Sequence, residues 1–151
     1  MQRIKISNKQ MAVASCFVLL IVYLLIAFLK KGSGDAGDSI EHYLISRYAY
    51  KYPEFFLHHW GKPLFVLLTA PFAQFGFTGI KVFNVFIAIL TAWFTYSTAE
   101  ELKLKHSAFI PLLLACSPLY FVLIFSGLTE HLFAFILVFS LYLEIKNKTI
   151  A

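Results

Sequence analysis

Three stretches of the chain are long, apolar and free of charge: residues 11–29, 82–99 and 107–129. An apolar helix of about 20 residues, rising ~1.5 Å per residue, crosses a hydrocarbon core of roughly 30 Å. The third stretch contains two prolines, which membrane helices tolerate. A fourth, residues 131–145, reaches spanning length only with residues 127–130 added. The pattern predicts an all-α integral membrane protein, a single membrane domain over residues 1–151 with four transmembrane helices.

The first stretch has the basic flank of a secretory signal, because Arg3, Lys5 and Lys9 precede it. It is longer than the apolar core of a typical signal. Lys30 and Lys31 follow it with no adjacent A-x-A cleavage site. We therefore interpret it as a retained anchor.

Segment 63–80 is also uncharged, but it contains Pro63, Pro71, Gly76 and Gly79. It could cross the membrane, or lie in the interface as a broken amphipathic helix. With an interfacial segment and an internal N-terminus, seven Lys and Arg residues lie inside and six outside, which accounts for all 13. This excess is small under the positive-inside rule, so charge alone does not decide between the two topologies.

Residues 30–80 form the first external loop in the four-span topology. A short amphipathic helix from Ser39 to about Tyr50 is predicted on the membrane surface, because apolar side chains recur there near helical spacing. Pro53 ends it. The sequence of residues 38–41 resembles a capping box, so Asp38 is expected to cap this helix unless it has a chemical role.

Composition removes the main alternatives to a membrane protein. Hydrophobic residues make up 60% of the chain and charged residues only 14%, with a mean hydropathy of +0.75, which excludes an ordinary soluble domain. The basic residues behind the net charge of +5 are scattered at the ends of apolar stretches. We therefore expect membrane lipid as a partner, and no nucleic acid.

The sequence predicts no metal site and no disulfide framework. Cys16 and Cys116 lie inside apolar stretches, where a thiol behaves as a small hydrophobe. His58 and His59 are adjacent, and adjacent side chains point apart on a helix, which disfavours a shared metal. No cofactor is predicted, and a divalent metal is left open.

Acidic residues gather in the external loop at Asp35, Asp38 and Glu41, with His42 beside them. Glu130 lies in the turn between the third and fourth stretches, which emerges on the same membrane face in the four-span topology. Two acidic positions far apart in sequence therefore approach one surface. Each also has a structural explanation, because a carboxylate at the start of a helix caps it or is favoured by its dipole.

Three motifs occur in order: Gly37-Asp38-Ser39-Ile40-Glu41-His42-Tyr43, His59-Trp60-Gly61-Lys62-Pro63-Leu64 and Phe75-Gly76. This order resembles the beginning of the GT-C membrane glycosyltransferases, closest to the protein O-mannosyltransferase and aminoarabinose transferase superfamily. Residues 126–130 resemble a Ser-x-x-Glu-like turn that recurs in this group, so the resemblance covers about residues 37–148. Two positions depart from the pattern: the usual Asp-Glu pair is Asp38-Ser39 here, and Leu64 stands where a second Pro is usual.

The resemblance implies inverting transfer of a sugar from a polyprenyl-phosphate donor to a hydroxyl acceptor. The reaction would occur at the external face of a plasma or inner membrane. By motif position Asp38 is the implied catalytic base, since the acceptor hydroxyl must lose its proton. Lys62 is implied to contact the donor phosphate. Glu130, Arg47 and His42 are implied in phosphate or acceptor binding.

Enzymes of this group usually have many more spans. The resemblance therefore implies that the chain is the N-terminal portion of a longer module, inactive by itself, with a missing C-terminal part as its partner. The alternative is a non-catalytic transport or assembly subunit. An enzyme requires Asp38, Lys62 and Glu130 on one face, whereas a transporter requires polar residues near mid-span. Few such residues occur besides Asn84 and hydroxyls such as Thr91, which favours the enzyme.

Overall fold

The computed structural model describes residues 7–33 and 37–150, and within them the regular structure is entirely helical. The elements are α1 (Asn8–Leu29), α2 (Asp38–Tyr48), η1 (Pro53–Leu57), α3 (Pro63–Ala73), α4 (Phe77–Glu101), η2 (Ser107–Phe109), α5 (Ile110–Ala115), α6 (Pro118–Ile124) and α7 (Glu130–Ile150). Arg3, Lys5 and Asp35, which entered the charge pattern above, lie outside the described residues.

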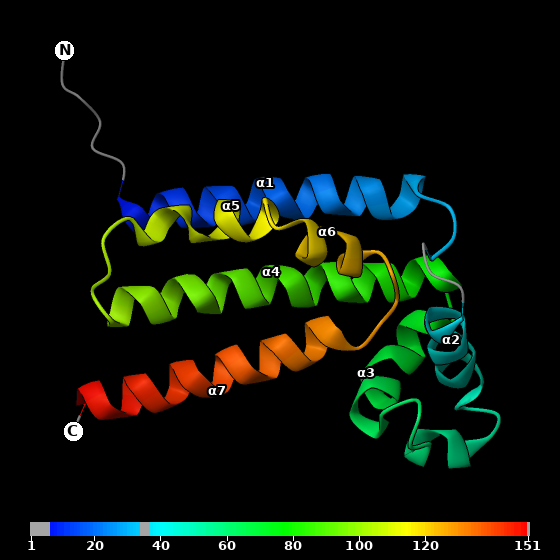
Figure 1. The fold of residues 1–151 in the computed structure, drawn as a ribbon. Helices are drawn as coiled ribbons and strands as arrows, with labels where there is room; N and C mark the ends of the chain where they lie inside the picture. Colours follow the sequence, from blue (N-terminus) through cyan, green and yellow to red (C-terminus); the bar gives the residue numbers. More distant parts are fainter. Residues whose placement is uncertain (1–6, 34–36, 151) are drawn as a thin grey trace.

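The long helices lie side by side, and the short ones of the first loop gather at one end (Figure 1). α4 is the central element, because it packs against α1, α7, α5 and α6. α2, η1 and α3 form a cap beside one end of α4 and beyond the start of α7 (Figure 1). Segments far apart in the sequence therefore meet at this capped end, which holds most of the residues singled out above.

Two helices, α1 and α4, are long and apolar enough to cross a membrane. A third candidate arises if α5 and α6, which meet at an angle of 67°, form one broken span. Pro118 explains the break, because its ring cannot continue the helix of α5. The described part of the chain is thus an all-helical protein with two or three candidate spans. α7 is long but carries Glu144, Lys146 and Lys148 near its end, so the fourth span stays a prediction.

The ambiguous segment after Lys62 splits into two helices. α3 has 11 residues, so it rises about 16 Å and cannot cross a hydrocarbon core by itself. Gly76 has a φ of +79°, a conformation that favours glycine, and it redirects the chain into α4. At Gly79 a Cβ would lie 1.8 Å from the backbone oxygen of Phe72, so a glycine lets α3 and α4 approach this closely.

The first surface helix has nearly the predicted bounds, but its predicted cap is wrong. Gly37 is the N-cap, and its carbonyl accepts the N–H groups of Ile40 and Glu41, both at 3.0 Å. Asp38 is the first residue inside the helix, where its carboxylate faces the positive end of the dipole. The helix begins one residue earlier than predicted because Gly37 adopts the capping position.

Side chains on α2 hold the cap together. Ser46 and Thr69 share a hydrogen bond of 2.8 Å between buried hydroxyls. Arg47 donates from Nη1 to the carbonyl oxygens of Ala73 and Gln74, at 3.0 and 3.2 Å, and so closes the C-terminus of α3. These bonds fix α3 against α2 and determine where the loop before α3 lies.

Candidate functional site

His42 occupies the centre of the capped end. Its side chain is only 6% exposed, and its ring centroid lies 5.8 Å from that of Phe65. Asp38, Lys62 and Glu130 are exposed, and each lies close enough to the imidazole to act on its charge, as does the neighbouring Glu41. The structure therefore brings together four of the five predicted site residues, from α2, the loop before α3 and the start of α7.

The two predicted acidic residues occupy equivalent positions in their helices. Asp38 is the first residue of α2 and Glu130 the first residue of α7. The carbonyl of Thr129 accepts the N–H of Phe133 at 3.1 Å, so α7 begins directly after Thr129. The N-terminus of each helix carries a partial positive charge that favours an anionic group.

Burial sets the charge state of His42. Burial lowers the pKa of the His42 imidazole below its ordinary value; Asp38 and Glu130 oppose that shift, and Lys62 adds to it. Its Nδ1 has no hydrogen-bond partner among the described residues. A neutral imidazole with one free nitrogen therefore lies beneath the exposed Asp38, Lys62 and Glu130.

Lys62 has an unusual backbone. Its φ is +59°, which is uncommon for a residue other than glycine and costs about 1–3 kcal/mol. Its carbonyl accepts the N–H of Val66 at 3.0 Å, so it begins α3. Its ammonium lies 5.7 Å from the ring of Trp60. Such strain collects at functional sites, and no sequence signal indicates it at a lysine.

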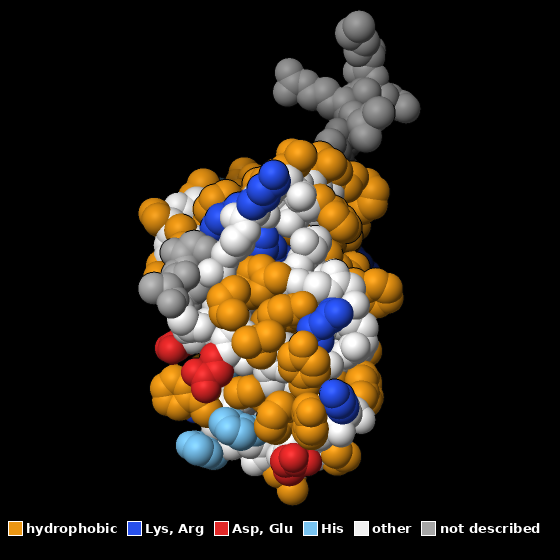
Figure 2. Space-filling view, turned by 90° about the vertical axis from the view of Figure 1, so that its right-hand side faces the viewer, with side chains coloured by type: hydrophobic (Ala, Val, Ile, Leu, Met, Phe, Trp, Pro, Cys, Tyr) orange, Lys and Arg blue, Asp and Glu red, His pale blue; other side chains and the backbone are white. Residues whose placement is uncertain are grey.

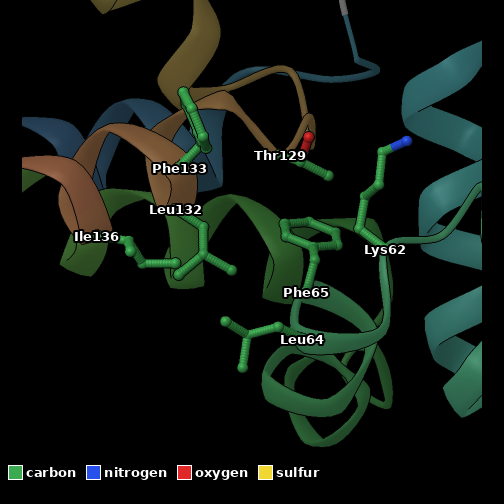
Figure 3. A pocket seen from close by; sticks show the side chains of 7 residues that line it. All are labelled: Lys62, Leu64, Phe65, Thr129, Leu132, Phe133 and Ile136. Atoms are coloured by element: carbon green, nitrogen blue, oxygen red, sulfur yellow. The ribbon is translucent and has the colours of Figure 1, made fainter.

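A cavity of about 260 Å³ opens beside Lys62, between α3 and α7. Its lining consists of two polar residues and five apolar ones: Lys62, Thr129, Leu64, Phe65, Leu132, Phe133 and Ile136. Figure 3 shows Lys62 and Thr129 together on one side, with the side chains from α7 and Leu64 on the other. The cavity therefore suits a molecule with an anionic group and an apolar chain.

Two polar side chains hold the turn before Glu130. They are Ser126, which belongs to the Ser-x-x-Glu-like turn of the sequence, and Asn84, one of the polar residues expected near mid-span. Ser126 Oγ donates to the carbonyl of Leu123 at 2.8 Å and accepts the N–H of Leu128 at 3.2 Å. Asn84, fully buried in α4, donates from Nδ2 to the carbonyl of Leu128 at 3.2 Å. Both side chains therefore shape the turn that positions Glu130.

Arg47 is the predicted site residue that the structure does not bring to the others. Its guanidinium binds the C-terminus of α3, whereas Lys62 lies at the N-terminus, about 16 Å away along that helix. No local pattern indicates this partner, because a basic residue near Tyr43 fits a ligand role equally well. A ligand role for Arg47 stays a prediction.

The cavity lining was missed from the sequence. Phe65, Leu132 and Ile136 look like any other apolar residues of a membrane helix, and no local signal marks them.

His58 and His59 were expected to point apart, which is wrong: their rings stack with centroids 5.2 Å apart. They lie in the loop after η1 and not on a helix, and His58 Nδ1 accepts the N–H of Gly61 at 3.3 Å.

Metal ligands do not gather in the part of the chain that the structure describes: it contains no group of three or more His, Cys, Asp or Glu side chains able to hold an ion.

Figure 2 looks onto the capped end and shows hydrophobic side chains in the middle, with basic, acidic and His side chains around them. This is the surface expected where a protein meets both lipid and water.

No family model, curated protein or solved structure matches the chain.

Proposed function

We propose that the chain provides the donor-lipid side of a GT-C-type membrane glycosyltransferase, which moves a sugar from a polyprenyl phosphate to a hydroxyl acceptor. One observation carries the proposal. Asp38, Lys62 and Glu130, from three separate segments, lie close enough to the buried His42 to act on its charge, and Lys62 also lines an apolar cavity. The motif order of the sequence supports the same reading independently of the cavity.

The cavity fits the part of the donor next to its phosphate. Lys62 and Thr129 supply a cation and a hydroxyl at its polar side, which suit phosphate oxygens. Leu64, Leu132 and Ile136 supply an apolar wall for the first isoprene units. At about 260 Å³ the cavity lies below the usual range for a whole ligand, roughly 300–1,000 Å³, so the rest of the polyprenyl chain would lie in lipid.

The chemistry assigns a role to each charged group. The acceptor oxygen forms a bond to the anomeric carbon while the bond from that carbon to the donor phosphate breaks. Asp38 takes the hydroxyl proton as general base, and Lys62 stabilises the negative charge on the departing phosphate. Glu130 and the neutral His42 orient the acceptor and the base.

The proposed topology has four spans with both described chain ends inside. Lys62 and Glu130 then lie on the external side of a plasma or inner membrane, while Lys103, Lys105 and Lys148 lie on the internal side. The side-by-side arrangement of the long helices supports it (Figure 1). Single-cysteine labelling from each side tests it, and labelling of positions 62 and 103 from the same side would overturn it.

The polar groups of α4 favour an enzyme over a transport subunit. The hydroxyls of Thr91, Thr95 and Ser97 donate to carbonyl oxygens one turn earlier in the same helix, at 2.7–2.9 Å. Side chains bonded in this way do not line a polar path for a solute. A transport role therefore gains no support from mid-span.

The decisive variant is Asp38→Asn, measured as sugar transfer from a polyprenyl-phosphate donor in native membranes, where any partner segment is present. The amide keeps the side-chain shape, and losing the charge at the helix start costs about 0.3–1 kcal/mol, so the protein should stay folded. Transfer should fall roughly 10²–10⁴-fold, because an amide cannot act as the base. Glu41→Gln is the matched control, since Glu41 is exposed in the same helical turn.

Lys62→Ala tests the donor side of the same assay. We expect a higher donor KM, whereas Lys51→Ala, another exposed lysine of this loop, should leave it unchanged. Near-normal turnover in Asp38→Asn at normal abundance would return Asp38 to a structural role and remove the base from the proposal.

A further inference from the structure

A second cavity lies at the end of the molecule opposite the cap, where the start of α1, the end of α4 and the later part of α7 meet. Its volume is about 290 Å³. Its lining combines one cation, two carboxylates, a hydroxyl and three aromatic rings: Lys9, Glu100, Glu101, Ser97, Trp93, Tyr96 and Tyr142. The cavity beside Lys62, between α3 and α7, has no carboxylate in its lining, so the two cavities differ in chemistry.

The polar groups of this cavity follow one another along one stripe of α4. Trp93, Ser97 and Glu101 are spaced four residues apart, so they lie on one face over about 12 Å. The indole lies deepest along the helix, the hydroxyl lies in the middle and the carboxylate lies at the helix end. This order matches the change from acyl chain to headgroup across a membrane interface.

The opposite charges in this cavity do not pair with each other. Among the described residues, one ion pair lies within 4.0 Å. It joins Glu144 and Lys148, which are both exposed on α7. Glu100 accepts hydrogen bonds from Asn8 and Ser107, which hold it in place. Lys9 is exposed and Glu101 is half-buried. A ligand that carries both a negative and a positive group satisfies both residues at once.

We propose that this cavity binds the headgroup of phosphatidylethanolamine. The lipid phosphate binds Lys9, and the primary ammonium donates hydrogen bonds to Glu101 and Ser97, with the ring of Trp93 beside it. A primary amine fits better than a trimethylated one, because carboxylate and hydroxyl groups accept N–H bonds that choline cannot donate. An anionic headgroup is disfavoured by the two glutamates.

The test is native mass spectrometry of the purified full chain in detergent, with equal amounts of phosphatidylethanolamine, phosphatidylcholine and phosphatidylglycerol of identical acyl chains. We expect the ethanolamine lipid to be preferred over each of the others by about tenfold, the effect of one charge-assisted hydrogen bond. Glu101→Gln should reduce the preference over phosphatidylcholine, because the neutral amide accepts a weaker hydrogen bond than the carboxylate. Lys9→Gln should weaken the binding of phosphatidylethanolamine and of phosphatidylcholine to the same extent.

Two control variants keep the test specific. Glu144→Gln and Lys105→Gln remove the same charges from exposed positions outside the cavity lining, and both should retain the preference. Thermal stability measured in parallel shows whether each variant is folded. Equal binding of the three lipids by the wild-type chain, or an unchanged preference in folded Glu101→Gln, would overturn the proposal.

Discussion

Replacing Gly79 by Ala should disrupt the junction between α3 and α4. The added Cβ would lie 1.8 Å from the backbone oxygen of Phe72 and 2.7 Å from its carbon. An ordinary carbon–oxygen contact is about 3.3 Å, so the end of α3 would have to retreat by roughly 1.5 Å. Because the clash is with backbone, no change of side-chain rotamer relieves it.

The expected cost lies at the upper end of the range for overpacked positions, about 3 kcal/mol. For a chain of this size that loss corresponds to a melting temperature lower by about 6–12 °C. Retreat of α3 would also disturb the bonds from Arg47 to the carbonyls of Ala73 and Gln74. The effect should therefore extend to the cap as a whole.

The assay is heating of the detergent-purified protein, followed by size-exclusion chromatography to measure the fraction that stays monodisperse. Thr78→Ala is the matched control, because Thr78 is the adjacent residue of the same turn and already has a Cβ. Gly76→Ala is an intermediate case, where no atom lies near the new Cβ but the φ of +79° costs about 1–3 kcal/mol. A Gly79→Ala protein as stable as Thr78→Ala would refute the close approach of α3 to α4.

Three further substitutions probe the cap. Arg47→Met should lower the thermal stability by about 1–3 kcal/mol, because two carbonyl oxygens at the end of α3 lose their charged donor; unchanged stability would mean that this contact is dispensable. Lys62→Gly should be about 1 kcal/mol more stable than Lys62→Ala in the same melts, because glycine accepts a φ of +59° without strain. His42 should make the folded state less stable as the pH falls below about 6.5: the unfolded imidazole then binds a proton that the folded one, with its lowered pKa, takes up less readily. Melts at pH 7.5 and pH 5 should therefore differ more for the wild type than for His42→Gln, and an equal difference would contradict a buried neutral imidazole.

Local sequence patterns were sufficient for the elements that depend on hydrophobicity alone. The uncharged stretches predicted α1 and α4, and the recurrence of apolar residues before Pro53 predicted α2 to within two residues at each end. The predicted four-span topology places Asp38 and Glu130 at one membrane face, and in the structure both act on the charge of His42. These features require no knowledge of which side chains touch.

The features that were missed depend on tertiary contacts. Gly37 and Asp38 can both occupy an N-cap, and only the path of the preceding loop decides between them. The carbonyls that Arg47 binds come from residues 26 and 27 positions further along the chain. Lys81 is one of the six Lys and Arg residues counted outside, yet its side chain is buried and its ammonium donates to the carbonyl of Lys30 at 2.6 Å. No pattern within one segment specifies such partners.

The proposed function requires that a polyprenyl phosphate binds between α3 and α7 with its phosphate at Lys62. The most direct measurement is photocrosslinking of the chain, in its native membrane, with a polyprenyl phosphate that carries a diazirine on the isoprene unit next to the phosphate. We expect crosslinks to peptides of α3 and the first two turns of α7, which unlabelled polyprenyl phosphate competes away and which are strongly reduced in Lys62→Ala. Crosslinks spread along the exposed apolar face of α1, unaffected by competitor or by Lys62→Ala, would contradict it.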